Sequence, residues 1–240
     1  MNMRLVYRNS TGMFFTLVMP TIIYVALSIL PIGSAFGAGS GVNYSKYVLP
    51  GIIAMTVMQG GIYGLAYWMI DLKSRGVIKR FLVTPLKQGE LVISVLASRV
   101  IIALIQAMFL TIIGVAFFHV NLNITMLFVF VFVAIGAAIF LLVGLLISMF
   151  ADTYEAAAPI TTAVGLPLTF LGNIFFPIDS LPAVLKVVGK ILPITYLADG
   201  IRILFLSGNI TRQVWIDLII LTGWMIIILA LTLWKFRLKE

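Results

Sequence analysis

Long stretches without a charged residue divide this sequence, and they limit its fold more than any other feature. No charge occurs between the members of five pairs: Arg8 and Lys46, Lys46 and Asp71, Arg99 and Asp152, Glu155 and Asp179, and Asp217 and Lys235. A membrane-crossing helix needs ~20 mostly apolar residues, and a charge within the hydrocarbon is costly. Each stretch is therefore long enough for one crossing, and the stretch from Arg99 to Asp152 is long enough for two.

The composition leads to the same class of protein. Hydrophobic residues make up 62% of the chain and charged residues only 10%, whereas soluble domains are about half apolar and a quarter charged. This excludes a water-soluble globular protein and a disordered one. Cysteine is absent and His119 is the one histidine, so we expect no disulfide scaffold and no metal centre. The net charge of +8 is attributed to membrane topology and not to a nucleic-acid partner.

We predict an all-α, multi-pass integral membrane domain over residues 1–240, with six transmembrane helices. They are expected at about 13–32, 48–70, 97–118, 125–149, 157–176 and 215–234. The apolar runs are continuous rather than alternating, which excludes a membrane β-barrel. Pro50 and Gly51 mark the expected start of the second helix. The first helix is expected to be retained, because the N-terminus lacks a cleavable signal pattern.

Lysine and arginine predict the orientation, since they are enriched in cytoplasmic loops. Eleven of the 16 basic residues fall on the side of the two termini and the 71–99 loop, Arg99 included, and five fall on the other side. Both termini are therefore expected in the cytoplasm of a cell with this protein in its plasma or inner membrane. An even number of crossings agrees with this orientation.

The 71–90 loop contains a short amphipathic pattern. Its apolar residues recur at helical spacing: Val77, Ile78, Phe81 and Leu82. Lys79 and Arg80 fall on the other face, and Asp71 precedes Arg75 by one helical turn, which favours an ion pair. Two interpretations are open: a basic loop that binds anionic lipid headgroups, or a cytoplasmic helix that docks to a partner.

Residues 177–208 are too polar and too often interrupted by proline to cross again. One helix face is apolar and comprises Leu181, Val184, Leu185, Val188 and Leu192. The expected local features are caps at Asp179 or Ser180 and at Thr195, a break at Pro193, and an ion pair between Asp199 and Arg202. We predict an extracytoplasmic re-entrant helical hairpin, which either shields the crossings or gates an exit.

The second and fifth predicted helices each carry a polar stripe: Gln59, Tyr63 and Tyr67, and Thr162, Thr169 and Asn173. Polar groups in lipid need partners, so the stripes face neighbouring helices or a wet path. Gly60 and Gly64 form a GxxxG that permits close packing. No carboxylate lies deep in a predicted crossing, which argues against a proton-driven carrier.

Four segments form a series in fixed order: 47–52 (YVLPGI), 75–86 (RGVIKRFLVTPL), 175–182 (FFPIDSLP) and 192–202 (LPITYLADGIR). Together they resemble ABC-2 type transporter permeases, over nearly the whole chain. Ser74 and Val77 depart from the glutamate and threonine that are common in the family. These departures concern contacts with the partner more than the fold.

The resemblance implies the membrane permease subunit of an ATP-driven exporter, and not an enzyme by itself. Its partners would be a cytoplasmic ABC ATPase subunit and a second permease, either another copy in a homodimer or a related chain. ATP-Mg would be bound by the ATPase, because this sequence has no phosphate-binding loop. The implied coupling residues are Arg75, Gly76, Lys79, Arg80, Thr84 and Pro85. The polar stripes would line the substrate path, and the outer gate would comprise Pro177, Pro182, Pro193, Tyr196, Asp199 and Arg202.

The expected function is efflux of an amphipathic substrate, such as a drug, an antimicrobial or a lipid-like compound. The alternatives are a stand-alone channel or carrier and a membrane-embedded lipid-modifying enzyme. Neither alternative explains the four segments. A metal-dependent lipid transferase would need clustered aspartates and Ser–His proteolysis would need a G-x-S-x-G turn, and the sequence has neither.

Overall fold

The computed structural model describes residues 10–29, 44–77, 88–118 and 124–237. All regular structure within these ranges is helical. The eight α-helices are α2 (Ser10–Ile29), α3 (Tyr44–Ser74), α5 (Gln88–Phe118), α6 (Leu127–Phe150), α7 (Tyr154–Leu171), α8 (Ala183–Ile191), α9 (Pro193–Ser207) and α10 (Arg212–Arg237). Two short 3-10 helices, η1 (Ile124–Met126) and η2 (Ile178–Ser180), precede α6 and α8.

Four helices in these ranges are long and apolar enough to cross a bilayer: α3, Val92–Phe118 of α5, α6, and Arg212–Lys235 of α10. They correspond to the predicted second, third, fourth and sixth crossings. The predicted first and fifth crossings correspond to α2 and α7. α7 has 18 residues and contains Pro159 and Pro167, and the apolar part of α2 is limited to Leu17–Ile29.

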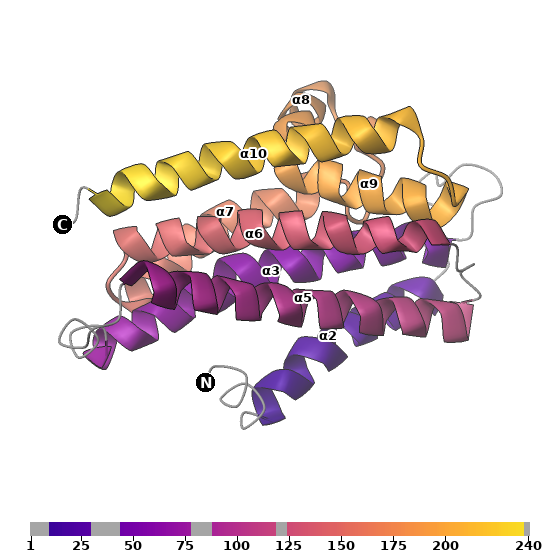
Figure 1. Ribbon diagram of the computed structural model, residues 1–240. Helices are drawn as coiled ribbons and strands as arrows, with labels where there is room; N and C mark the ends of the chain where they lie inside the picture. The colour runs from indigo at the N-terminus through magenta and orange to yellow at the C-terminus, as the bar shows by residue number, and fades with distance from the viewer. Residues whose placement is uncertain (1–9, 30–43, 78–87, 119–123, 238–240) are drawn as a thin grey trace.

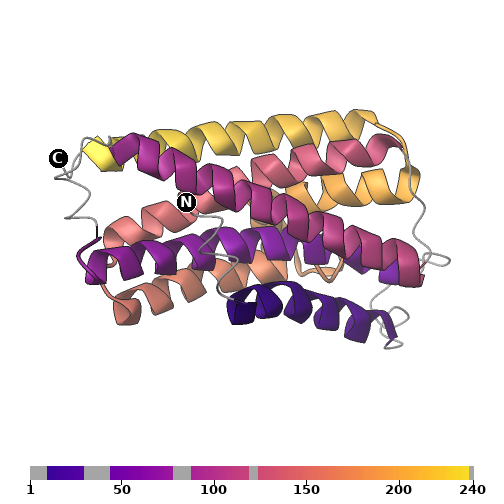
Figure 2. The ribbon, with the colours of Figure 1, turned by 60° about the horizontal axis from the view of Figure 1, so that its bottom comes forward.

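The long helices lie side by side, with their ends gathered at two opposite ends of the bundle (Figure 1). At one end of the bundle, three helices finish (α3, α6 and α10) and two begin (α5 and α7). We call this the basic end because Lys73, Arg75 and Lys235 belong to it. α9 finishes at the opposite end, where α10 begins, and we call this the hairpin end. Figure 2 shows α5 crossing obliquely over its neighbours.

Three predicted helix ends are wrong. α3 begins at Tyr44 and continues through Pro50, its seventh residue, although the proline removes the bond to the Lys46 carbonyl. α5 begins at Gln88 and not near residue 97, so Arg99 lies about three turns inside the helix rather than at its start. α7 ends at Leu171 and not near residue 176, because Asn173 leaves the helical conformation with a φ of 54°.

The most extensive contact between two helices in the described structure joins α3, the most buried of the four apolar helices, to α6. A Cβ added at Gly144 would lie 2.4 Å from the Gly61 carbonyl oxygen, and one at Gly61 would lie 2.6 Å from the Phe140 backbone. Gly60 has nothing within 4 Å of such a Cβ, and Gly64 meets only the Arg99 side chain at 3.3 Å. The close packing therefore depends on Gly61 and not on the predicted GxxxG.

Replacement of Gly144 by leucine is expected to destabilise the bundle strongly. The new side chain would collide with the backbone of α3, and overpacking of this kind costs about 1–3 kcal/mol or more. Gly223→Leu on α10 is the matched control, because nothing lies within 4 Å of a Cβ there. Thermal unfolding in detergent measures the difference. Equal midpoints for the two variants would contradict the close α3–α6 contact.

Candidate functional site

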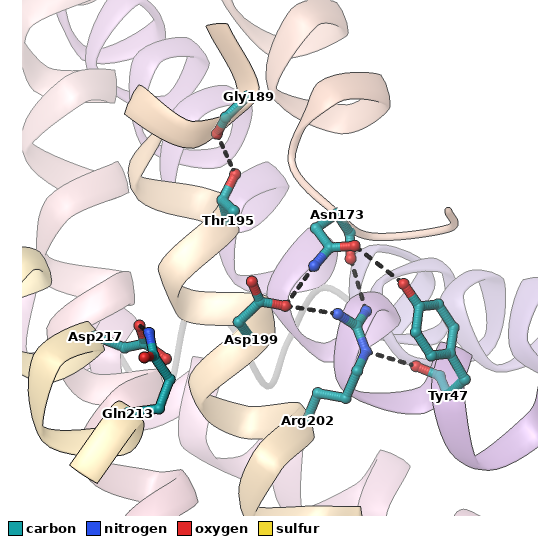
Figure 3. Close-up of polar contacts among 8 residues, drawn as sticks. All are labelled: Tyr47, Asn173, Gly189, Thr195, Asp199, Arg202, Gln213 and Asp217. Atoms are coloured by element: carbon teal, nitrogen blue, oxygen red, sulfur yellow. Dashed lines mark hydrogen bonds and ion pairs between the residues drawn. The ribbon is translucent and has the colours of Figure 1, made fainter. Parts of the chain in front are cut away.

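Arg202 of α9 is the centre of a buried polar cluster near the hairpin end (Figure 3). Arg202 is buried, with 6% of its surface exposed. The guanidinium donates from Nη1 to the Asp199 carboxylate at 2.8 Å, from Nη2 to the Asn173 carbonyl at 2.6 Å, and from Nε to the Tyr47 carbonyl at 3.3 Å. It also lies over the Tyr47 ring, 4.0 Å from the ring centroid. One cation therefore joins α3, α9 and the chain that follows α7.

Asn173 closes this cluster into a ring of contacts. Its side-chain amide donates to the Asp199 carboxylate, and its Oδ1 accepts from the Tyr47 hydroxyl at 3.0 Å. Asparagine is among the few residues that tolerate its left-handed conformation. That conformation ends α7 and turns both the side chain and the carbonyl of Asn173 toward α9. We call Tyr47, Asn173, Asp199 and Arg202 the hairpin-end cluster.

Two further hydrogen bonds hold α8 against α9. The Thr195 hydroxyl donates to the Gly189 carbonyl at 2.6 Å, and the Tyr196 hydroxyl donates to the Lys190 carbonyl at 2.6 Å. The predicted cap at Thr195 is therefore wrong, because α9 begins at Pro193 after Leu192. α8 likewise follows Pro182 without a side-chain cap. The predicted pair of Asp199 and Arg202 is confirmed.

The charges of the hairpin region differ in their surroundings. Burial raises the pKa of the Asp199 carboxyl, while the Arg202 charge and the Asn173 amide act to lower it. Asp179 is exposed and pairs with Lys186 at 2.5 Å, and this hydrogen bond lowers its pKa. The buried Asp199 carboxylate therefore depends on Arg202 for its charge compensation, whereas the exposed Asp179 pairs with Lys186 at the surface.

Asp217 of α10 is a second buried carboxylate near the same end. It is 1% exposed, and its Oδ1 accepts from Gln213 Nε2 at 2.8 Å. Its Oδ2 has no hydrogen-bond partner in the described part of the chain. Figure 3 shows Asp217 beside α9 but apart from the hairpin-end cluster. The described residues contain no group of three or more histidine or acidic side chains that could hold a metal.

The basic end has its own polar contacts. Lys73 donates to the Asp152 carboxylate at 3.0 Å and to the Ser148 carbonyl, so the last turn of α3 is tied to the end of α6. The predicted pair of Asp71 and Arg75 is confirmed at 2.9 Å. α3 ends directly after, where Gly76 adopts a φ of 64°. Gly76 therefore sets the direction in which the chain leaves α3.

Some residues of the two predicted polar stripes contact neighbouring helices, and others lie at the surface. Tyr67 bonds to Thr161 of α7 at 3.1 Å, and the Tyr63 hydroxyl lies where a Cβ on Gly165 of α7 would stand. Thr169 donates to the Gly165 carbonyl of its own helix at 2.8 Å. Gln59 and Thr162 are exposed. The stripes thus contain both helix contacts and free polar surface.

The other predicted site residues are only partly within the described structure. Arg75 is exposed and Gly76 half-buried at the end of α3, but Lys79, Arg80, Thr84 and Pro85 lie outside the described residues. The three hairpin prolines mark helix starts: Pro177 before η2, Pro182 before α8, and Pro193 as the first residue of α9.

Sequence reasoning missed Tyr47 and Lys73 as site residues. Tyr47 entered the prediction only within the 47–52 segment, and Lys73 only through its position in the predicted 71–90 loop. Both make contacts across more than 70 positions of sequence, to Asn173 and to Asp152. α3 begins one turn before Tyr47 and ends at Ser74 after 31 residues, a rise of roughly 46 Å. One continuous helix therefore connects the basic end to the hairpin-end cluster.

Comparison with known proteins gives a consistent result. A family described as "ABC-2 type transporter" matches residues 2–206. The "Inner membrane transport permease YadH" of Escherichia coli K12 is 29% identical over 178 residues, which are 74% of this chain and 69% of YadH. "Nodulation protein J" of Rhizobium leguminosarum bv. trifolii is 23% identical over 177 residues, 73% of this chain and 67% of that protein.

A third relative is longer than the chain. The "Probable multidrug ABC transporter permease YbhS" of Escherichia coli K12 is 25% identical over 192 residues, or 80% of this chain. The match covers 51% of YbhS, so the chain spans about half the length of that relative. The family match includes the hairpin-end cluster and the whole of α3.

Proposed function

Because the chain belongs to the ABC-2 type transporter family and is a permease subunit of an ABC transporter, we propose that it is part of an exporter. We propose that it exports an amphipathic molecule, with energy from a separate ATPase subunit. The observation that carries the proposal is the continuity of α3. The 75–86 segment follows α3 directly and contains Gly76 as its second residue. At the other end of α3, Tyr47 contributes to the hairpin-end cluster by accepting a hydrogen bond from Arg202. A force on the 75–86 segment would therefore act directly on the hairpin.

We place the basic end in the cytoplasm of an inner-membrane protein. The name of YadH supports the inner membrane. Lys73, Arg75 and Lys235 belong to the basic end, and lysine and arginine favour the cytoplasmic side. α2 and α7 would complete six crossings, with both ends of the chain in the cytoplasm. α8 and α9 would form the re-entrant hairpin of the outer leaflet.

In this arrangement the 75–86 segment is the coupling helix for the ATPase, which binds ATP-Mg. Closure of two ATPase subunits would move α3 as a rigid element, and the hairpin-end cluster would transmit the movement to α9. A second permease, either another copy or a related chain, would complete a central path. The exposed Gln59 and Thr162 would face this path, and the hairpin residues Pro177, Pro182, Pro193, Tyr196, Asp199 and Arg202 would form its outer gate.

Two features support an amphipathic substrate. The crossings are almost free of charge, and the name of the relative YbhS refers to multidrug transport. A large polar ligand would require many more hydrogen-bonding groups along the crossings.

The test is reconstitution with the ATPase whose gene adjoins that of this chain. The pair is expected to copurify, and vesicles containing it should transport a cationic or neutral amphipathic dye only when ATP is present. An ATPase with its phosphate-loop lysine replaced is the control. Transport by this chain alone without ATP would overturn the proposal in favour of a stand-alone carrier, and failure of the two proteins to associate would also overturn it.

A further inference from the structure

Arg99 lies inside the apolar part of α5 and not in a loop. It is the eighth residue of Val92–Phe118, which has 27 residues. Such a helix rises roughly 40 Å, whereas the hydrocarbon of a bilayer is about 30 Å thick. If the helix is centred, Arg99 lies roughly 5 Å within the hydrocarbon at the basic end. A charged residue within the hydrocarbon is costly, at most about 2.5–3.5 kcal/mol at the centre of the bilayer, and is commonly functional.

The guanidinium of Arg99 extends sideways to α3 and not toward the basic end. Its Nη1 lies 3.3 Å from the position of a Cβ on Gly64, which is ten residues before the end of α3 at Ser74. Ten residues correspond to roughly 15 Å along the helix. The cation therefore remains at the depth of its own backbone and does not reach the membrane surface.

Arg99 lines a cavity of about 40 Å³ between α3, α5 and α6. This exceeds the ~10–15 Å³ that one water molecule needs. Gly60 and Gly61 leave the α3 wall without side chains, and Thr56 and Gln106 add polar atoms. The remaining lining residues are apolar: Val57, Ile102, Ala103, Ala137 and Leu141. The cavity therefore presents one cation within an otherwise mostly apolar lining.

No hydrogen bond or ion pair of Arg99 occurs among the residues that the structure describes. A second copy of the chain offers no carboxylate at this depth either. None of the eight acidic residues lies between Glu90 and Asp152, and none lies in α3 before Asp71. Within the described part of the chain, no carboxylate therefore compensates the charge of Arg99.

We propose that the Arg99 cavity binds the anionic headgroup, phosphate or carboxylate, of an amphipathic molecule in the leaflet at the basic end. The planar guanidinium can hold two oxygens of such a group at once. Gly60, where a Cβ would meet nothing within 4 Å, provides the space, and the apolar lining residues Ile102 and Leu141 suit the apolar part of the molecule next to its headgroup. The inference rests on the proposed function only in assigning this leaflet to the cytoplasm.

The test measures lipid retention by the purified chain, without the ATPase, so its outcome is separate from that of the transport test. Protein in detergent is exposed to equal amounts of phosphatidylglycerol and phosphatidylcholine, and the bound lipids are counted by native mass spectrometry. Wild-type protein is expected to retain phosphatidylglycerol preferentially. Arg99→Gln should weaken this retention about tenfold, the effect of losing one charge-assisted contact.

A second variant removes the space and keeps the charge. Gly60→Val is expected to weaken retention similarly, and its fold should survive because nothing lies within 4 Å of a Cβ there. Arg212→Gln at an exposed site and Gly223→Leu are the controls, and both should behave as wild type. Competition with millimolar inorganic phosphate shows whether a free anion or only a lipid headgroup occupies the cavity. Preferential retention that is unchanged in both Arg99→Gln and Gly60→Val would overturn the proposal, as would its absence in the wild type.

Discussion

Replacement of Arg202 by methionine is expected to lower the free energy of unfolding by about 3–5 kcal/mol and to abolish transport. The substitution leaves the Asp199 carboxylate without its cation and the Asn173 and Tyr47 carbonyls without their donor. Because Arg202 is almost fully buried, water cannot replace these contacts. Thermal and denaturant unfolding of the purified protein measures the loss.

A second substitution separates charge compensation from simple packing. The double variant Arg202→Met with Asp199→Asn is expected to be more stable than Arg202→Met alone, because asparagine removes the uncompensated charge and can still bond to Asn173. Arg212→Met, at an exposed position, is the control and should change stability by less than about 0.5 kcal/mol. Wild-type stability of Arg202→Met would contradict the role of the hairpin-end cluster.

Replacement of Gly76 by valine is expected to uncouple ATP hydrolysis from transport. Gly76 has a φ of 64°, and a residue with a branched side chain adopts this conformation at a cost of about 1–2 kcal/mol. The cost would redirect the chain that enters the 75–86 segment. Nothing lies within 4 Å of a Cβ at Gly76, so the bundle itself should fold normally. Transport should fall about tenfold, which corresponds to 1.4 kcal/mol, while ATP hydrolysis by the complex continues.

Asparagine at position 76 provides the matched control, because asparagine tolerates the left-handed conformation. Gly76→Asn should therefore retain most of the transport that Gly76→Val loses. ATP hydrolysis and dye efflux are measured in the same vesicles for both variants. Equal transport by the valine and asparagine variants would show that the backbone conformation of Gly76 has no part in coupling.

The sequence was sufficient to locate the long apolar helices but not their ends. Gaps between charges predicted α3, α5, α6 and α10, because the cost of a charge in hydrocarbon acts locally. The start of α3 was placed too late because Pro50 was taken as a boundary, whereas α3 continues through this proline. Arg99 was placed at the boundary between the cytoplasmic loop and the third helix, because one charge inside a long apolar helix breaks the rule on which the prediction relied.

The candidate site was predictable only where its contacts are short-range. The pairs Asp71–Arg75 and Asp199–Arg202 follow from helical spacing. The contacts of Arg202 to Tyr47 and Asn173 do not, because they depend on how three separate segments pack together. They also require the left-handed backbone of Asn173, which asparagine permits but which the sequence does not signal.

The central claim is that an ATPase on the cytoplasmic side acts on the chain at the end of α3. The chain has no cysteine, so a single introduced thiol reports one position. Ser74→Cys at the basic end and Ala183→Cys on α8 are both exposed sites, and a membrane-impermeant thiol reagent is applied to intact cells and to inverted vesicles. Ser74→Cys should react only in inverted vesicles and should crosslink to the ATPase, whereas Ala183→Cys should react only in intact cells. Labelling of Ser74→Cys from outside intact cells would contradict the account.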